Sequence, residues 1–320
     1  MPHIARSLAI IFLCAAAGLT QSGWVDRSMH LKGDLVAVFF TSSDKGWVAG
    51  DDGYLAATTD GGNTWVPYPL NTTEDINEIY FRNDDNGYLV AGRKMFVTRD
   101  GGKTWRETRI FRSGDFGAGR PEFLSIRFSD KKRGYVVGSV LRGEDIVVDS
   151  LVMRTDDGGD TWRRIPVPTK AELFHLDFDG NSKGWIVGDN GTVLSSVDEG
   201  QSWNLQNSGT TQPLYNVDFR DSKEGYIVGK GGTILRTENG GMNWTRVVTP
   251  FKQSIMRVDF ADDKNGWAVG YAGTILRSGD KGKSWVLTDS PTKERLYGLY
   301  MDKKYGWAVG ERGTILGFKR

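Results

Sequence analysis

Seven short runs of alternating side chains recur along the chain, each six residues long. Alternation with a period of two over such a length predicts a β-strand. The runs are LVAVFF from Leu35, INEIYF from Ile76, FLSIRF from Phe123, LFHLDF from Leu173, LYNVDF from Leu214, IMRVDF from Ile255 and LYGLYM from Leu296. Because similar units return along almost the whole chain, it is predicted to fold as a repeat protein.

Each run is followed by a second strand that opens with Gly and an aromatic residue. The pairs begin at Gly46, Gly87, Gly134, Gly184, Gly225, Gly266 and Gly306, at intervals of 41, 47, 50, 41, 41 and 40 residues. Four strands per unit of this length are typical of a β-propeller. The sequence therefore predicts an all-β, seven-bladed β-propeller.

A polar turn with the pattern Ser/Thr-x-Asp-x-Gly-x-x-Trp closes six of the units. Its third position is filled by Asp60, Asp100, Asp157, Asp198, Asn239 and Asp280. A short Asp or Asn side chain accepts hydrogen bonds from N–H groups of its own turn, and the following Gly supplies a positive φ. These residues are therefore predicted to be structural, and Asn239 keeps the accepting oxygen.

The seventh unit stops after its third strand. Trp24 lies eleven residues before Leu35, the same offset that separates Trp65 from Ile76. Residues 24–27 are therefore predicted to be the fourth strand of the last blade, which closes the ring and removes its open edges. All eleven tryptophans then have a position in the repeat, so none remains as a platform for stacking a sugar.

The first 18 residues have the pattern of a secretory signal peptide. His3 and Arg6 precede the apolar run of residues 8–13, which is too short to span a bilayer, and small residues follow. We expect a signal peptide over residues 1–18, one propeller over residues 19–320, and an exported protein in the periplasm, the thylakoid lumen or the extracellular space. Lipid anchoring at Cys14 is the alternative, but the preceding Leu13 is not the small residue that it needs.

Charge and composition exclude several classes of function. The formal net charge of +1 becomes zero if Arg6 is removed with the leader, because 40 basic and 40 acidic residues remain. Bulk electrostatics therefore give no reason to expect a nucleic-acid partner. Removal of the only cysteine, Cys14, leaves His30 and His175 as the remaining Cys or His residues, so no metal site and no cofactor are expected.

His175 is the one histidine inside a predicted strand run. Its counterparts in other runs are Ser125, Asn216 and Arg257, near the inner rim of the ring. The sequence predicts a packed or capped histidine here rather than a catalyst.

The closing turns resemble the Asp-box, or bacterial neuraminidase repeat, of sialidases, xyloglucanases and sortilin-type receptors. Combined with Gly-Trp/Tyr-x-x-Gly and Gly-Thr-Ile-Leu in seven blades, they make the chain after residue 22 similar to the photosystem II stability and assembly factor family. The resemblance implies a non-enzymatic lumenal or periplasmic propeller that binds a subunit of a membrane-protein complex or its precursor, such as a photosystem reaction-centre subunit. It also implies an arginine-rich contact surface. We further expect a monomer.

Two insertions break the regular spacing. Trp105 to Phe123 spans 18 residues instead of 11, and Gly138 to Thr155 spans 17 instead of the usual eight. They are expected to be neighbouring loops on one face of the ring, and variable loops on a rigid scaffold are where binding usually resides.

The insertions and the adjacent turn carry several cations. The predicted partner-binding residues are Arg93, Lys94, Arg109, Arg112, Arg120 and Arg142. Because Arg makes bidentate contacts with carboxylates, these residues favour an acidic or C-terminal segment of a partner. The alternative is a solvated surface neutralised by Asp115, Glu122, Glu144, Asp145 and Asp149.

A carbohydrate-active propeller, either a sialidase- or xyloglucanase-like glycosidase or a glycan-binding protein, is the alternative function. Arg164-Ile-Pro resembles a sialidase tripeptide, but it follows Trp162 and so falls on an outer strand. A glycosidase pair of carboxylates could be drawn only from Glu122, Glu144, Asp145 or Asp149, and no spacing fixes such a pair. The chain is therefore predicted to have no catalytic residues and not to be an enzyme.

Overall fold

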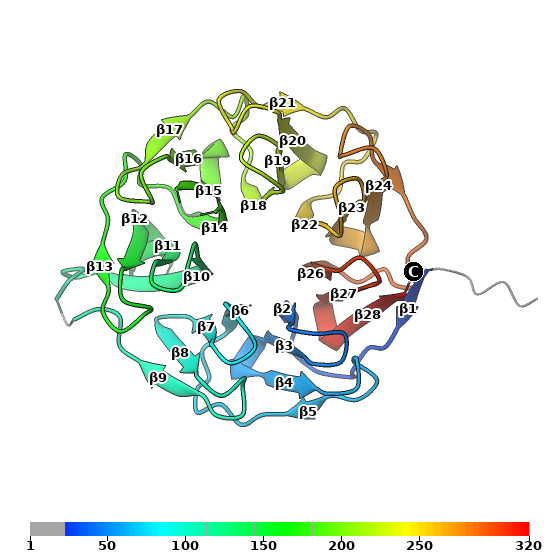
Figure 1. Ribbon diagram of the computed structural model, residues 1–320, viewed down its shortest axis with the longest axis horizontal. Helices are drawn as coiled ribbons and strands as arrows, with labels where there is room; N and C mark the ends of the chain where they lie inside the picture. Colours follow the sequence, from blue (N-terminus) through cyan, green and yellow to red (C-terminus); the bar gives the residue numbers. More distant parts are fainter. Residues whose placement is uncertain (1–22, 113, 144, 181, 320) are drawn as a thin grey trace, which may run out of the picture.

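The computed structural model describes residues 23–112, 114–143, 145–180 and 182–319. These residues form seven four-stranded antiparallel sheets arranged as blades around a central axis (Figure 1). The predicted all-β, seven-bladed propeller is confirmed. The predicted signal peptide and Cys14 lie outside the described residues.

Each blade runs from an inner strand at the axis to an outer strand at the rim. The inner strands are β2 (Leu35–Phe40), β6 (Ile76–Phe81), β10 (Arg120–Phe128), β14 (Leu173–Asp179), β18 (Leu214–Phe219), β22 (Ile255–Phe260) and β26 (Leu296–Met301). The second strands are β3 (Gly46–Gly50), β7 (Gly87–Ala91), β11 (Gly134–Arg142), β15 (Lys183–Gly188), β19 (Gly225–Gly229), β23 (Gly266–Gly270) and β27 (Tyr305–Gly310).

The third and fourth strands complete the blades. The third strands are β4 (Leu55–Thr58), β8 (Lys94–Thr98), β12 (Ile146–Thr155), β16 (Val193–Ser196), β20 (Thr233–Thr237), β24 (Ile275–Ser278) and β28 (Thr314–Lys319). The outer strands are β5 (Val66–Pro67), β9 (Arg106–Thr108), β13 (Arg163–Arg164), β17 (Asn204–Gln206), β21 (Thr245–Arg246), β25 (Val286–Leu287) and β1 (Trp24–Asp26). Short 3₁₀ turns join second to third strands in five blades, at Asp51–Gly53, Asp189–Gly191, Lys230–Gly232, Tyr271–Gly273 and Glu311–Gly313.

The last blade is closed by the two ends of the propeller. β1 pairs antiparallel with β28, with Trp24 opposite Phe318 and Asp26 opposite Leu316. The Arg27 N–H then donates to the Ile315 carbonyl at 2.8 Å. The prediction that residues 24–27 supply the fourth strand of this blade is confirmed.

The core lies between blades as much as within them. The second strand β3, GWVAG, is buried along its whole length, and a Cβ on Gly46 would lie 2.6 Å from the Phe40 ring. In six blades the aromatic residue that follows the Gly packs on the inner-strand Phe of the next blade, as Trp47 does on Phe81 with 4.1 Å between ring centroids. Ring stacking of this kind adds to the burial of apolar area, so the repeated Gly-aromatic pair sets the spacing between blades.

The Asp-box turns are held by their own side chains, as predicted. In the first blade, the Asp60 carboxylate accepts the Thr64 hydroxyl at 2.6 Å, the Thr64 N–H at 2.9 Å and the Thr58 hydroxyl at 2.8 Å. These hydrogen bonds favour the ionised form and lower the pKa of Asp60 to about 2. Asn239 makes the corresponding bonds with one oxygen, to the Thr237 hydroxyl at 2.9 Å and the Asn243 N–H at 3.0 Å.

Candidate functional site

The two insertions form one surface on the third blade. β10, β11 and β12 have nine, nine and ten residues, against four to seven in the corresponding strands of other blades. Arg120 pairs with Leu141, so the insertions are neighbours, as predicted. Residues 140–150 are not mainly a loop as expected, because β11 and β12 keep pairing as far as Arg142 and Ile146.

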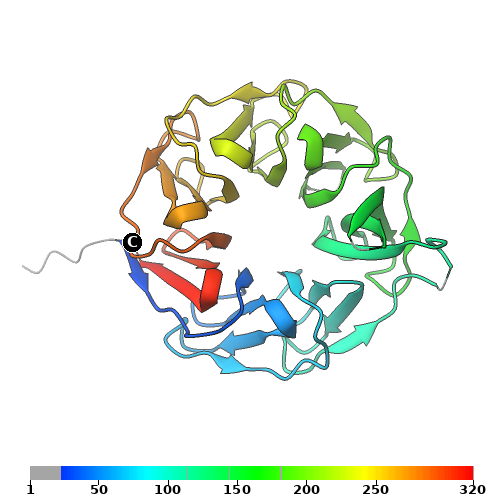
Figure 2. The same ribbon diagram turned by 180° about the vertical axis from the view of Figure 1, so that it is seen from behind.

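The segment between β9 and β10 projects beyond the outer edge of the ring (Figures 1 and 2). Its described residues are anchored by apolar contacts. Ile110 is 3% exposed, and the Phe111 ring lies 6.0 Å from Phe123 and 5.5 Å from Phe116. The cations that the segment carries therefore stand on a packed base rather than on a free loop.

Three of the predicted contact residues surround one shallow cavity. Arg93, Lys94 and Arg109 line a space of about 330 Å³ together with Glu107 and Phe111. Arg93 lies 3.7 Å from Glu74, and Lys94 lies 3.6 Å from Glu107. The structure therefore brings these cations together, but with carboxylates beside two of them.

Arg120 sits on the long hairpin between two carboxylates. Its guanidinium lies 2.6 Å from Asp145 and 3.6 Å from Glu122. Asp149 pairs instead with Arg164 at 2.7 Å, and Glu144 lies outside the described residues. Four acidic residues near the insertions, Glu74, Glu107, Glu122 and Asp145, thus neutralise Arg93, Lys94 and Arg120.

The other three predicted cations differ. Within the described part of the chain, Arg109, Arg112 and Arg142 form no ion pair, and Asp115 accepts only the backbone N–H of Arg112, at 2.7 Å. An exposed ion pair contributes about 0–1 kcal/mol to stability. The paired cations Arg93, Lys94 and Arg120 could therefore exchange their carboxylates for those of a partner at little cost in free energy.

A second charged cluster, which sequence analysis missed apart from His175 and Arg257, fills the bore of the ring. Glu78 of β6 is 4% exposed, and its Oε1 lies 2.8 Å from Arg127, 3.5 Å from Arg257 and 3.6 Å from His175. Arg127 also lies 2.9 Å from His175 Nε2. Because Arg257 belongs to the sixth blade and Glu78 to the second, this bore cluster links blades that are not adjacent.

Much of the polar lining of the bore serves backbone groups. An inner strand has an unpaired edge facing the axis, and buried N–H groups need acceptors. Glu78 accepts the Ile126 N–H at 3.1 Å and Asn216 accepts the Val258 N–H at 2.9 Å, each from the next blade. Asp177 and Asp259 do the same for Phe219 and Met301, both at 2.7 Å.

His175 is a packed histidine, as predicted. It is 3% exposed, and its Nδ1 lies 3.1 Å from the Asn216 amide. Burial, followed by the positive charge of Arg257, lowers the pKa of His175 to about 3. The imidazole is therefore neutral near pH 7 and poorly matched to general acid–base work.

The carboxylates considered for a glycosidase do not converge on the bore. Glu122 and Asp145 flank Arg120, and Asp149 holds Arg164 on β13, the outer strand predicted for it. Among the described residues, no three His, Cys, Asp or Glu side chains are grouped so that they could hold a metal ion. No helix in the described part of the chain is long and apolar enough to cross a membrane.

These features define a closed, seven-bladed Asp-box propeller with a charged bore and one enlarged blade. A sequence model of the family described as Photosynthesis system II assembly factor YCF48 matches residues 67–171 and 160–253. The chain belongs to this family, and the resemblance drawn from its motifs is confirmed.

Individual relatives agree with the family. The chain is 32% identical over 182 residues to a chloroplastic photosystem II stability/assembly factor HCF136 of Cyanidioschyzon merolae, covering 53% of this chain and 36% of the relative. It is 35% identical over 82 residues to the photosystem II assembly lipoprotein Ycf48 of a Picosynechococcus strain, covering 25% of this chain and 23% of the relative. The chain thus matches about a third or less of the length of these relatives.

A solved structure described as YCF48 bound to D1 peptide shares the fold. It superposes with a TM-score of 0.75 at 20% identity, covering 93% of this chain and 97% of that one. Likeness at this identity supports the seven-bladed architecture.

Proposed function

We propose that this chain is an exported, non-catalytic scaffold that holds a segment of a photosystem II reaction-centre subunit, or of its precursor, during assembly. The family match over residues 67–253 carries the proposal. The solved relative described as bound to a D1 peptide supports the choice of a reaction-centre polypeptide as the partner. The neutral, hydrogen-bonded state of His175 supports binding rather than catalysis.

The partner segment is proposed to dock on the insertion surface, defined as Arg93, Lys94, Arg109, Arg112, Arg120 and Arg142. Arg109, Arg112 and Arg142 supply cations without carboxylate partners in the described structure, and the 330 Å³ cavity beside Arg93 supplies a recess. Planar guanidinium groups suit a C-terminal carboxylate or acidic side chains. An extended acidic peptide segment is the ligand that this arrangement fits best.

The compartment follows from the same proposal. The relatives are named as chloroplastic or as lipoproteins, and residues 1–18 have the pattern of an export signal. We place the chain in the thylakoid lumen or periplasm, where it would meet the exported segments of a reaction-centre subunit.

The test measures binding of a synthetic peptide from the C-terminal segment of a D1-type subunit. Reversal of Arg109, Arg112 and Arg142 to Glu is expected to weaken binding by at least about tenfold, since each lost charge-assisted contact costs about 1 kcal/mol or more. Reversal of three cations on other blades, Arg246, Lys252 and Lys283, is the matched control and should change affinity little.

Two outcomes would contradict different parts of the proposal. Equal weakening by both triple variants would show that the insertion surface is not the docking site. Absence of reaction-centre subunits from material captured from native membranes by the wild-type chain would overturn the assembly role itself.

A further inference from the structure

The Asp-box turns have a second task, which is to cover the neighbouring blade. The glycine at the fifth position of each turn lies on the second-strand aromatic ring of the preceding blade. A Cβ on Gly62 would lie 2.4 Å from Trp307, and one on Gly282 would lie 2.3 Å from Tyr226. Such contacts leave room only for glycine.

The polar tips of four of the six covered rings bond to the covering turns. The hydroxyls of Tyr88, Tyr135 and Tyr226 donate to backbone carbonyls of Gly158, Glu199 and Lys281 at 3.0, 2.5 and 2.8 Å, and the Trp185 indole donates to the Gly240 carbonyl at 3.2 Å. Each acceptor is the residue just before the glycine that contacts the ring. Six seams therefore share a ring with a glycine over it, and four of them add a carbonyl at the tip of the ring, whereas the Trp307 indole N–H has no hydrogen-bond partner among the described residues.

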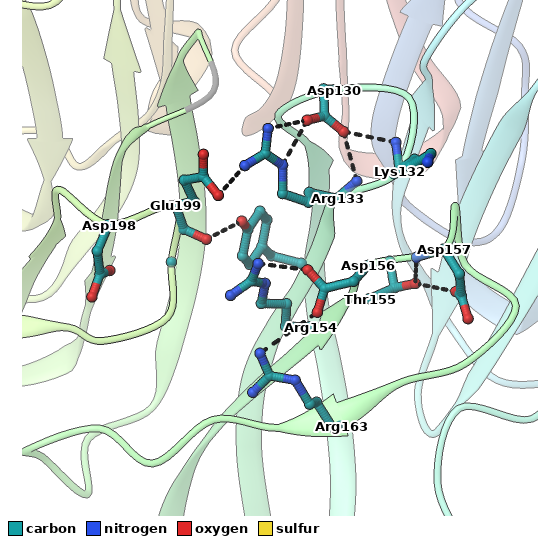
Figure 3. A network of polar contacts seen from close by, with 12 residues as sticks. Asp130, Lys132, Arg133, Arg154, Thr155, Asp156, Asp157, Arg163, Asp198 and Glu199 are labelled. Atoms are coloured by element: carbon teal, nitrogen blue, oxygen red, sulfur yellow. Dashed lines mark hydrogen bonds and ion pairs between the residues drawn. The ribbon is translucent and has the colours of Figure 1, made fainter.

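Figure 3 shows such a covered seam, between the third and fourth blades. Glu199 of the covering turn contacts Arg133, and Arg154 reaches Asp156 at 2.5 Å. Arg154 is 4% exposed and lies 6.0 Å above the Tyr135 ring. In this seam the cation stacked on the ring is buried and paired, whereas Arg99, over the covered Tyr88 ring, is exposed and forms no ion pair among the described residues.

Among the described residues, the seam between the sixth and seventh blades has no Asp-box cover. Trp267 of the sixth blade should be covered by an Asp-box of the seventh, but the described chain has none there, since β28 runs to Lys319 and β1 begins at Trp24. The Phe318 ring occupies part of the position that a covering turn would take. Its centroid lies 4.8 Å from that of Trp267 and 5.3 Å from that of Trp24. A cavity of about 780 Å³ lies at this place, lined by Trp24, Trp267, Arg277, Phe318, Asn265 and Lys303.

Arg277 carries the charge of this seam cavity. It stacks 5.4 Å from the Trp267 ring, as Arg154 does on Tyr135, but it is exposed and has no ion pair among the described residues. The position that holds Asp156 in the third blade, and Glu238 against Arg236 at 2.6 Å in the fifth, is Gly279 here. Two acids also line the cavity, Asp289 and Asp302, and Asp302 accepts the Lys304 N–H of its own turn at 3.2 Å.

We propose that the seam cavity is a second docking site, which receives a glycine-containing turn of a partner polypeptide. The partner glycine would lie on Trp267, and a side-chain oxygen of the turn would accept a hydrogen bond from Arg277, as Asn63 accepts one at 2.7 Å from Arg27 over the Trp307 ring. Six covered seams of this chain show that the surface is shaped for such a turn. The site is distinct from the insertion surface, which lies across the ring on the third blade (Figure 1), so either can fail alone.

The probe is a synthetic peptide with the first Asp-box of this chain, residues 58–66, because that turn covers a tryptophan in the structure. Calorimetry should show saturable binding, and the Trp267 indole signal should shift in NMR spectra of the full chain. Arg277→Glu should weaken binding by at least about fivefold through loss of a charge-assisted contact. Arg246→Glu, on the fifth blade, is the matched control and should leave affinity unchanged.

A peptide with Val in place of the glycine equivalent to Gly62 should not bind, because a side chain cannot fit over the ring. Three results would overturn the proposal. These are no binding at all, binding that is indifferent to Arg277→Glu and to the valine, and binding that appears only after removal of residues 1–22. The last result would assign the cavity to the amino-terminal segment of the chain itself.

Discussion

At the residue scale, an Asp-box uses both oxygens of one carboxylate. Asp157 Oδ1 accepts the Thr155 hydroxyl at 2.7 Å and the Thr161 N–H at 2.9 Å, and Oδ2 accepts the Thr161 hydroxyl. Burial opposes ionisation, but these bonds outweigh it and lower the pKa of Asp157 to about 2. In the fifth blade, Asn239 has a single acceptor oxygen. The residue four positions later is Asn243, whereas the other Asp-boxes have Ser or Thr there. The fifth turn therefore lacks both the second carboxylate oxygen and the hydroxyl that would donate to it.

This pairing predicts a graded response at Asp157. Asp157→Ala should lower the free energy of unfolding by about 1 kcal/mol, or Tm by about 2 °C in a chain of this size. Asp157→Asn should cost less, and Asp157→Asn with Thr161→Asn should recover part of the loss by copying the fifth blade. Calorimetry at pH 7 measures all three.

The loss at Asp157 should also depend on pH in a fixed direction. A lowered carboxyl pKa stabilises the fold above the unfolded pKa of about 4 and loses that contribution as the pH falls towards 2. The gap between wild type and Asp157→Ala should therefore shrink from pH 4 to pH 2. A gap that stays constant would show that the carboxylate charge is not what holds the turn.

At the scale of elements, the six-residue runs of the inner strands have two structural roles. Their apolar positions fill the blades, and their third and fifth positions face the bore, where side chains accept N–H groups of the next inner strand. Glu78 is such an acceptor for Ile126 and also holds Arg127 and Arg257. A single side chain therefore supports an edge of the third blade and a contact across the ring.

Glu78→Ala should be strongly destabilising. It leaves two arginines in the bore without their carboxylate and the Ile126 N–H without its acceptor, which should cost about 3 kcal/mol. Glu78→Gln keeps an acceptor for Ile126 and should cost less. Glu107→Ala, which removes an exposed partner of Lys94, is the control and should change stability by at most about 0.5 kcal/mol. Denaturant unfolding that ranks Glu78→Ala with the control would contradict the bore cluster as a structural tie.

The bore also predicts a dependence on pH near neutrality. Burial raises the pKa of Asp259 to about 7 even though the Met301 N–H lowers it. The folded protein thus keeps a proton that the unfolded chain loses near pH 4, and the stabilising contribution disappears as the pH rises through about 7. Asp259→Asn keeps a hydrogen-bond acceptor but cannot ionise. The Tm of this variant minus that of wild type should therefore be larger at pH 8 than at pH 5.

Asp280→Asn provides the control for that experiment. Asp280 lies in the same blade. Burial opposes its ionisation, but hydrogen bonds from Ser284 and Ser278 outweigh burial and lower the pKa of Asp280. It is therefore ionised at both pH values, and its effect on Tm should be the same at each. An Asp259→Asn difference that does not change with pH would contradict proton uptake in the bore.

The sequence predicted the strands and turns far better than the side-chain contacts in the bore. Strands, Asp-boxes and closure follow from local patterns, because turn chemistry and period-two alternation act within a few residues of each other. The Glu78–Arg257 contact joins residues 179 positions apart, and no local pattern specifies which side chains meet across an axis. The signal was nevertheless present in part, since aligning the seven runs places Glu78 and Arg127 at bore positions that most other blades fill with polar or aromatic residues.

The insertions illustrate the same limit. The sequence shows that there are extra residues between Gly138 and Thr155. It does not show whether they extend the β11–β12 hairpin or form a loop, because that depends on strand pairing and on packing against Phe116 and Ile110. Of the acids expected to neutralise these cations, Glu122 and Asp145 do so at Arg120, but Asp149 pairs with Arg164, and the further partners Glu74 and Glu107 come from a different blade.

At the scale of the whole molecule, ring closure rests on one short strand. β1 has three residues, yet Trp24 is 8% exposed and packs against Trp267 and Phe318. The other blades take their fourth strand from the adjoining chain, whereas this one pairs residues about 290 positions apart. Closure removes the open edges that a propeller cannot leave exposed.

Removal of residues 1–26 should therefore open the ring. Loss of Trp24 burial and of the β1–β28 ladder should cost about 3–5 kcal/mol, which lowers Tm by roughly 10 °C, and should speed proteolysis near β28. Removal of residues 1–22 is the matched control and should leave Tm unchanged, because β1 begins at Trp24. If both truncations unfold alike, closure must come from contacts elsewhere. The Glu78–Arg257 contact between the second and sixth blades is the first to examine, by combining the longer truncation with Glu78→Gln.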